Sequence, residues 1–262
     1  MIMKQKPIII WWGVNTSYPF LEEGLRAEEP VPILKKFLTD CATTDVKKKG
    51  YINPSGQVGS ASDLAHCPAI IDELKNVYGI KSYYDYTLNI DSQNAISTED
   101  YGQDFFNKHI TIRSERLLSF KQGWLFFAPY EKNLLMSQQH PFLEDNDVTN
   151  NTIIIPGQFD CARYFRDLEF AFIFKKKTTS VQFLKDEITC YIRFHTKRPI
   201  ILKQFFWDKR INDYYHPLMA SKHHKYSHGP VSKILPFYYK LFDKFQFKKK
   251  LIKIIENNLV KE

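Results

Sequence analysis

"DLEFAFIFK" (167–175) and "ITCYIRFHT" (188–196) are the stretches that decide the fold class of this 262-residue chain. In both, apolar side chains occupy every second position, namely Leu168, Phe170, Phe172 and Phe174 in the first and Ile188, Cys190, Ile192 and Phe194 in the second. Alternation with a period of two predicts half-buried β-strands. The second strand leaves Tyr191, Arg193 and His195 on its other face.

The chain around these stretches adds further strands with few helices between them. "PIIIWWGV" (7–14) is a continuous apolar run bounded by Pro and Gly, which is typical of a buried strand. Other strands are predicted at 80–90, 109–114, 117–129, 133–138 and 199–205. The pair 117–129 and 133–138 is expected to form a hairpin with its turn at "PYEK". This spacing favours an α+β fold that is mainly antiparallel β: a jelly-roll-like barrel or sandwich with flanking helices and a C-terminal helix.

Helices are predicted at three places. "CPAIIDELKNVYG" (67–79) has Pro68 at a first helical position and Gly79 at a helix end, which predicts a helix over 67–78. A short amphipathic helix is expected after Pro30 and Pro32. The remaining helices are predicted after residue 206. We therefore divide the chain into a β-rich barrel or sandwich domain, 1–205, with one inserted helix, and a basic helical C-terminal segment, 206–262.

The net charge of +8 belongs to the C-terminal segment, because Lys203–Glu262 contains 13 Lys/Arg and 5 Asp/Glu. Interleaved Lys and aromatic residues in this segment suit an anionic partner for Lys203–Lys261, either nucleic acid or an anionic lipid surface. A helix that docks its Leu, Phe and Ile side chains on the β-domain and leaves its Lys side chains in solvent explains the same residues. The absence of a recognised nucleic-acid motif favours the docked helix.

Cysteine usage and the N-terminus bear on location. Cys41, Cys67, Cys161 and Cys190 are spread singly through the chain. This pattern disfavours a structural zinc site and indicates reduced thiols. The apolar run near the N-terminus is too short for a transmembrane helix and has no cleavage site of small residues. We expect a cytoplasmic protein.

Several short motifs, taken in order, carry a resemblance to a known family. They are "WW" (11–12), "CPAIIDELKNVYGI" (67–80), "GWLFFAP" (123–129), "HP" (140–141) and "IPGQFDCARY" (155–164). Over residues 8–207 the chain resembles an uncharacterised family found in the genomes of tailed phages and of their bacterial hosts. The family positions fall on Trp124, His140, Pro141, Pro156, Gly157, Asp160 and Tyr164. Cys161 and "LKDE" (184–187) depart from the family pattern. The resemblance implies a β-rich fold and a phage-associated origin, with no established activity.

His140 and Asp160 are the first candidate site residues, because they flank strands that are expected to be neighbours. An imidazole and a carboxylate suit a metal ion or general-base chemistry. With His195 they would provide the two His and one carboxylate of a facial Fe(II) site, or hold another divalent metal, in a jelly-roll oxygenase or cupin-like enzyme. The sequence has no His-x-Asp or His-x-Glu. The alternative interpretation, which we favour, is that these positions shape turns and that Asp160 caps backbone amides.

Arg193 and His195 form the second candidate pair, because they share the polar face of one strand, with Lys197 and Lys203 beside them. If that face lines a cavity, the planar fork of Arg suits a carboxylate, phosphate or sugar acid. If it does not, the same side chains are an ordinary solvated surface. The leading hypothesis is a non-catalytic or small-ligand-binding accessory protein whose pocket includes His140, Asp160, Tyr164, Arg193 and His195.

Overall fold

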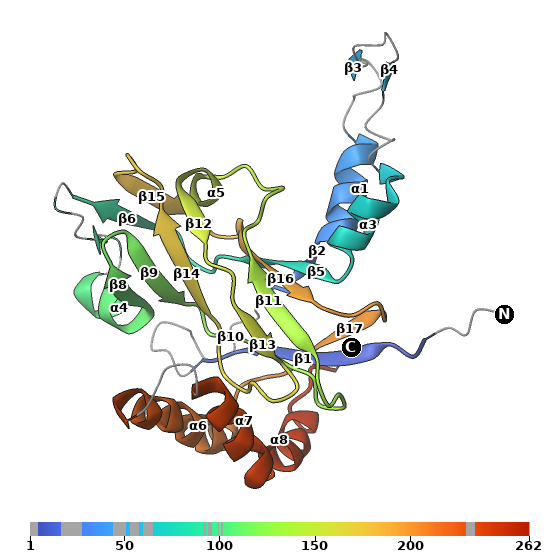
Figure 1. Ribbon diagram of the computed structural model, residues 1–262, viewed down its shortest axis with the longest axis vertical. Coiled ribbons are helices and arrows are strands. Elements are labelled where there is room, and N and C mark those ends of the chain that lie inside the picture. Colours follow the sequence, from blue (N-terminus) through green and yellow to red (C-terminus); the bar gives the residue numbers. More distant parts are fainter. Residues whose placement is uncertain are drawn as a thin grey trace.

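The computed structural model describes residues 5–16, 28–43, 51–52, 58–59, 65–91, 93, 96–98, 100, 102–228 and 234–261. The protein has an α+β fold with mostly antiparallel sheets. One pair of helices projects from the edge of the sheets and another group packs beneath them (Figure 1). The Gly- and Ser-rich segment 47–62, whose composition is typical of a loop, lies outside the described residues, apart from the short pair β3 (Tyr51–Ile52) and β4 (Val58–Gly59).

Two of the sheets contain the N-terminal strand and the strand that carries Arg193. The first has the order β10 (Trp124–Phe127), β1 (Ile8–Val14), β17 (Ile200–Gln204). The second has the order β13 (Gln158–Asp160), β11 (Leu135–Gln139), β16 (Ile188–Phe194), β5 (Val77–Lys81), β2 (Val31–Pro32). β1 and β17 run parallel, and the other pairs in these two sheets are antiparallel.

Two further sheets and two short helices belong to the part of the fold before the C-terminal helices. One sheet has the order β12 (Thr152–Ile154), β14 (Glu169–Phe174), β9 (Leu117–Lys121), β8 (Ile110–Ser114). The other has the order β15 (Ser180–Phe183), β6 (Tyr86–Ile90), β7 (Ile96–Ser97). The helices α4 (Gly102–His109) and α5 (Asp147–Asn151) precede β8 and β12. Among the described strands no sheet closes into a barrel.

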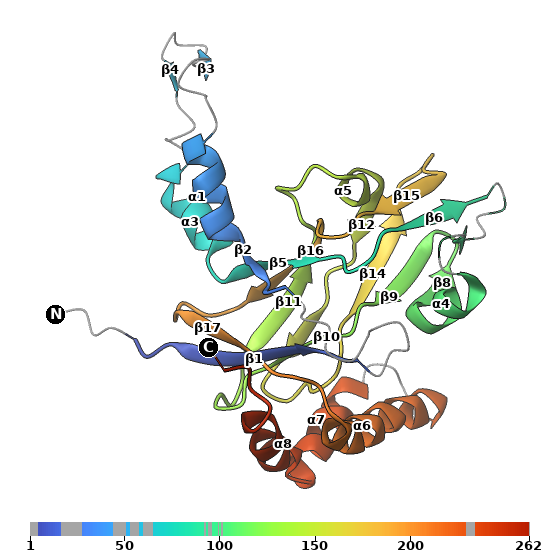
Figure 2. The same ribbon diagram turned by 180° about the vertical axis from the view of Figure 1, so that it is seen from behind.

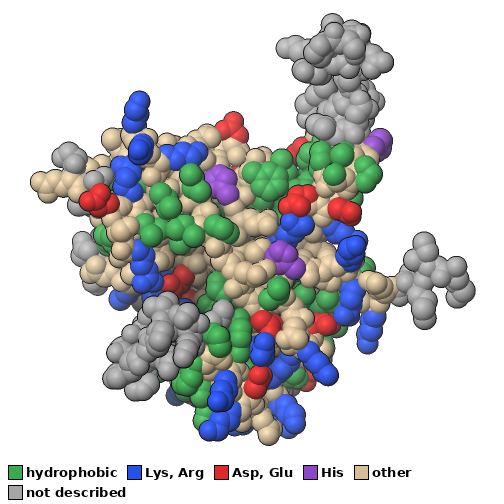
Figure 3. Space-filling view, in the orientation of Figure 1, with side chains coloured by type: hydrophobic (Ala, Val, Ile, Leu, Met, Phe, Trp, Pro, Cys, Tyr) green, Lys and Arg blue, Asp and Glu red, His purple; other side chains and the backbone are tan. Residues whose placement is uncertain are grey.

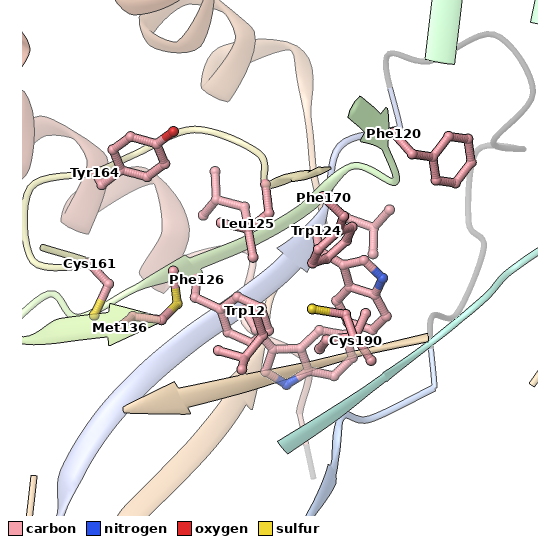
Figure 4. Close-up of a cluster of buried hydrophobic side chains, with 14 of the residues drawn as sticks. Trp12, Phe120, Trp124, Leu125, Phe126, Met136, Cys161, Tyr164, Phe170 and Cys190 are labelled. Atoms are coloured by element: carbon pink, nitrogen blue, oxygen red, sulfur yellow. The ribbon is translucent and has the colours of Figure 1, made fainter. Parts of the chain in front are cut away.

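The main core is an aromatic-rich cluster that draws on all four larger sheets. Figure 4 shows Trp12, Trp124 and Phe126 at its centre. The rings of Trp12 and Trp124 lie 5.4 Å apart, and those of Trp124 and Phe126 stack at 6.2 Å. The predicted alternation of β14 is confirmed, since Phe170 and Phe172 are fully buried. Apolar burial of this kind supplies the main stabilisation of the fold.

The predicted hairpin between 117–129 and 133–138 is wrong. The first stretch is two strands, β9 and β10, which belong to different sheets, and β11 pairs with β13 and β16 instead. Gly123 explains the break, because its φ of 75° is a left-handed conformation that few other residues adopt. The chain therefore changes direction between β9 and β10.

The predicted helix over 67–78 is shorter, and Gly79 does not end it. α3 spans Pro68–Leu74, and Asn76 takes the left-handed φ of 59° that ends the turn. Gly79 lies inside β5, where a Cβ would come within 2.7 Å of Ile188 Cδ1. A strand rather than a helix forms there because 77–81 pairs with β16.

β16 also departs from strict alternation at its start. The register shifts between Ile188 and Cys190, as in a β-bulge. Ile188 therefore packs with Tyr191 in a second, smaller cluster under α1 (Ile33–Thr43), whereas Cys190 and Ile192 face the main core.

The C-terminal segment folds into α6 (Lys209–His228), α7 (Ile234–Lys244) and α8 (Phe247–Glu256). Their buried side chains join the main core and include Ile211, Leu218, Tyr238, Phe242, Leu251 and Ile255. Lys240, Lys244, Lys249, Lys250 and Lys253 are exposed, which supports the docked-helix interpretation. The chain then returns to the sheet, because the Val260 N–H donates to the Gln204 carbonyl at 2.9 Å. This places the C-terminus beside β17 and β1 (Figure 2).

The C-terminal helix that the sequence predicts is divided into two, α7 and α8. Gln246 adopts a left-handed φ of 53° between α7 and α8, which interrupts the helical hydrogen bonding. No helix in the described part of the chain combines the length and the apolar character needed to cross a membrane.

Candidate functional site

A polar pocket of about 560 Å³ lies where α3 meets the end of β16. Its lining consists of Asp72, Lys75, Arg193, Phe194, His195, Thr196 and Lys197, and we call it the basic pocket. Figure 3 shows Lys/Arg, Asp/Glu and His side chains gathered beneath the α1–α3 pair. Two of the residues predicted from the sequence, Arg193 and His195, therefore line one pocket.

Strand alternation places Arg193 on the outer face of β16, away from the main core, and His195, directly after the strand, continues the same face. Arg193 forms an ion pair with Glu73 of α3. His195 follows the strand, and its Nε2 lies 2.9 Å from Ser137 Oγ on the neighbouring strand β11. The two side chains are thus oriented by α3 on one side and by β11 on the other.

Asn76 joins the two walls of the basic pocket. Its side-chain Nδ2 donates to the carbonyl oxygens of Thr196 at 2.8 Å and Arg198 at 3.1 Å. Its own carbonyl accepts from the Phe194 N–H at 3.0 Å. The turn that follows α3 is therefore held against the turn that follows β16, and this contact brings Lys75 to the same pocket as Arg193.

The electrostatics of the basic pocket favour an anion, because its lining holds three cationic side chains against one carboxylate, Asp72. Burial lowers the pKa of His195, and the positive charge of Arg193 lowers it further, while Glu73 acts in the opposite direction. His195 is therefore a neutral hydrogen-bonding group at pH 7. Lys75 and Lys197 are exposed and have no ion-pair partner within the described residues. Arg193 adds a planar guanidinium that can bind a carboxylate or phosphate with two hydrogen bonds.

His140 lies apart from this pocket. In the register of β11 and β16, Met136 faces Phe194 and Gln139 faces Tyr191. His140 follows Gln139, so it lies at the other end of the strand pair from His195. Its Nδ1 is buried without a hydrogen-bond partner among the described residues, and burial, together with the charge of Lys175, lowers its pKa.

Asp160 is a turn residue whose carboxylate is saturated by the protein. Oδ1 accepts from the N–H groups of Leu134 at 3.0 Å and Ala162 at 3.1 Å, and Oδ2 accepts from Arg163 Nε at 2.8 Å. The Asp160 N–H donates to Tyr239 Oη at 2.8 Å. Only 4% of Asp160 is exposed. This arrangement matches the alternative in which Asp160 caps backbone amides.

Tyr164 is also a packing residue. It is buried and stacks on Phe159 with 4.4 Å between ring centroids. The guanidinium of Arg166 lies 5.2 Å from the centre of its ring. Burial raises the pKa of the Tyr164 hydroxyl well above its usual range. Tyr164 does not line the basic pocket.

The three residues suggested as metal ligands, His140, Asp160 and His195, are not brought together. In the described part of the chain, no group of three or more His, Cys, Asp or Glu side chains is arranged to hold a metal ion. The four cysteines are free thiols, and Cys161 and Cys190 are buried. The described residues thus assemble no ligand set for Fe(II) or another divalent metal.

Sequence reasoning missed Lys75 and Asn76. Both were placed inside the predicted helix over 67–78, where they would have been ordinary helix-surface residues. Asn is one of the few non-Gly residues that tolerates the left-handed conformation, and this property was the available signal for an earlier helix end.

Comparisons of the sequence with protein-family models and with curated proteins give no match.

Proposed function

We propose that this protein binds a small anionic ligand, a carboxylate or a phosphate, in the basic pocket and carries out no chemistry on it. One observation carries the proposal: Arg193, His195, Lys75 and Lys197 line one pocket of about 560 Å³. Sites for small ligands have volumes of about 300–1,000 Å³ and a few convergent polar groups. The role would be that of an accessory protein.

Three broader expectations belong to the same proposal and rest on sequence features. A phage-associated origin is supported by the motifs at 123–129, 140–141 and 155–164. A cytoplasmic location is supported by the singly spread cysteines. A jelly-roll-like arrangement of the sheets is supported by the spacing of the strands.

Binding would proceed by exchange of the Glu73 carboxylate for the ligand anion. In the free protein Glu73 forms an ion pair with the Arg193 guanidinium, but 55% of the Glu73 side chain is exposed. Exposed ion pairs contribute only about 0–1 kcal/mol, so Glu73 is released at low cost. The ligand anion would then take the guanidinium fork, with the ammonium groups of Lys75 and Lys197 nearby.

Two substitutions with opposite expected effects test the proposal. Titration with inorganic phosphate or acetate, followed by calorimetry and by NMR shifts of the His195 ring, measures the affinity. Arg193→Gln should weaken binding about 10-fold, which corresponds to one lost charged hydrogen-bond pair. Glu73→Gln removes the same ion pair but leaves Arg193 free, and should tighten binding.

Arg210→Gln is the matched control, because Arg210 is an exposed arginine paired with Asp208 at the start of α6, away from the basic pocket. It should leave the affinity unchanged. Equal effects of Arg193→Gln and Arg210→Gln, or no binding of either anion, would reject the proposed function.

A further inference from the structure

A second cavity adjoins the basic pocket. It is an open groove of about 680 Å³ between α1, β5 and the start of β17, and we call it the apolar groove. Its apolar lining includes Leu34 and Leu38 from α1, Val77 and Tyr78 from β5, and Ile200 from β17. The groove is thus lined mainly by hydrocarbon.

The two cavities share a wall. Lys75 lines both of them. The ridge between them consists of Lys75 and Asn76 on one side and the turn from Thr196 to Pro199 on the other. Asn76 ties these parts together through its hydrogen bonds to Thr196 and Arg198. The apolar groove and the basic pocket therefore open on the two sides of one short, hydrogen-bonded ridge.

We propose that the two cavities together bind a single-chain amphiphilic anion, with its alkyl chain in the apolar groove and its carboxylate or phosphate head in the basic pocket. This inference rests on the proposed function and names the class of ligand. Charge complementarity selects the occupant, because three of the four charged side chains that line the basic pocket are cationic. The groove, in contrast, is apolar apart from Lys35, a few polar groups and the shared Lys75. A neutral apolar ligand would leave these cations unused, and a short anion would leave the groove unfilled.

Exposure of the groove residues adds to the argument. Leu38 is 38% exposed on the face of α1 that lines the groove. Burial of an alkyl chain there removes both its own surface and that of Leu38 from water, and each buried methylene contributes about 0.8 kcal/mol. Lys75, exposed on the ridge, has a flexible stem that can follow the head group.

The experiment compares ligands that differ in one part only. Dodecanoate and acetate share a head group, as do dodecyl phosphate and inorganic phosphate, and dodecanol has the chain without the charge. With monomeric ligand, the long-chain anions should bind at least 100-fold tighter than their short counterparts, and dodecanol should bind more weakly than dodecanoate. Equal affinities for the long-chain and the short anions would overturn the inference while leaving the proposed function intact.

Substitutions in each cavity test whether the alkyl chain binds in the apolar groove and the head group in the basic pocket. Leu38→Gln should weaken dodecanoate at least 5-fold and leave acetate unchanged. Ile201→Gln is the matched control, because Ile201 is 42% exposed and lies next to Ile200 but does not line the groove. Arg193→Gln should weaken long and short anions alike. Equal effects of Leu38→Gln and Ile201→Gln would overturn the inference.

Two further outcomes separate the remaining alternatives. Cosedimentation with phosphatidylglycerol vesicles without binding of monomeric dodecanoate would overturn the inference in favour of a membrane surface. Binding of dodecanoate that is insensitive to Arg193→Gln, with no binding of inorganic phosphate or acetate, would overturn both the inference and the proposed function.

Discussion

The turn at Asp160 and the basic pocket lie on the two sides of β11. They differ in how far the protein itself supplies partners for their charged side chains. β13, which ends at Asp160, pairs with one edge of β11, and β16 pairs with the other. The Asp160 carboxylate receives three hydrogen bonds from the protein. In the basic pocket, Arg193 has one exposed partner and Lys75 is exposed. Polar residue types are similar in both places, but the Asp160 carboxylate is satisfied inside the protein, whereas the charged groups of the basic pocket stay accessible to solvent.

The largest effect we expect is a loss of stability when the Asp160 carboxylate is removed. Asp160→Ala leaves the buried N–H groups of Leu134 and Ala162 without an acceptor, which should lower the free energy of unfolding by about 3 kcal/mol. Asp160→Asn keeps one acceptor oxygen and should cost less. Urea denaturation measures both. A loss below about 1 kcal/mol for Asp160→Ala would show that this turn is not a stabilising element.

A second substitution tests the close packing between β5 and β16, the strand that carries Arg193. Gly79→Ala introduces a methyl group where a Cβ would meet Ile188 Cδ1 at 2.7 Å, and overpacking of this kind should lower the free energy of unfolding by about 2 kcal/mol. Binding of phosphate to the remaining folded protein should be unchanged, because Gly79 does not line the pocket.

Gly157→Ala is the control, since the nearest atoms to its Cβ would be the tip of the Phe159 ring at 3.2 Å and Gln138 Oε1 at 3.4 Å, neither of them as close as the contact at Gly79. Thermal denaturation of the two variants gives the comparison. Equal losses of stability would contradict the role of the close packing between β5 and β16.

These differences also explain what the sequence could predict. Alternation identified β14 and β16 and placed Arg193 and His195 on one face, because a period of two is a local property of the chain. The partners of β10 and β11 were mispredicted, because pairing depends on long-range packing and on the conformation of Gly123. The grouping of His140, Asp160 and His195 failed for the same reason: the register of β11 and β16 separates His140 from His195.

Lys75 illustrates a different limit. No motif marks it, and it reaches the pocket because Asn76 ends α3 early and binds the turn after β16. When one left-handed residue ends a helix early, the side chains that follow point in other directions than they would in a continued helix. The site residues that strand alternation determines were predicted, and those that depend on this turn were not.

The basic pocket should respond to pH through His195. Burial and Arg193 lower the pKa of His195 in the free protein, and an anion beside the ring favours its protonated form and raises that pKa. Because proton and anion binding are linked, the affinity should rise as the pH falls through the pKa of His195 in the complex and should level off below its pKa in the free protein.

Sulfate keeps its charge across this range and is the suitable probe. Calorimetry at pH 8 and pH 5.5 should show about 3- to 10-fold tighter binding at the lower pH, equivalent to about 1 kcal/mol. His195→Gln should abolish the difference. The same pH dependence in His195→Gln would assign it to another group.

The smallest effect concerns the outer edge of the Asp160 turn, where Arg163 contacts two carboxylates. Its Nε lies 2.8 Å from Asp160, whose side chain is 5% exposed, and its Nη1 lies 3.4 Å from Asp243, whose side chain is 56% exposed. Solvent screens the second pair, so Asp243→Asn should change the free energy of unfolding by less than about 0.5 kcal/mol. Urea denaturation beside Asp160→Ala tests this directly. A loss comparable to that of Asp160→Ala would mean that charge alone, and not burial with backbone hydrogen bonds, stabilises the turn.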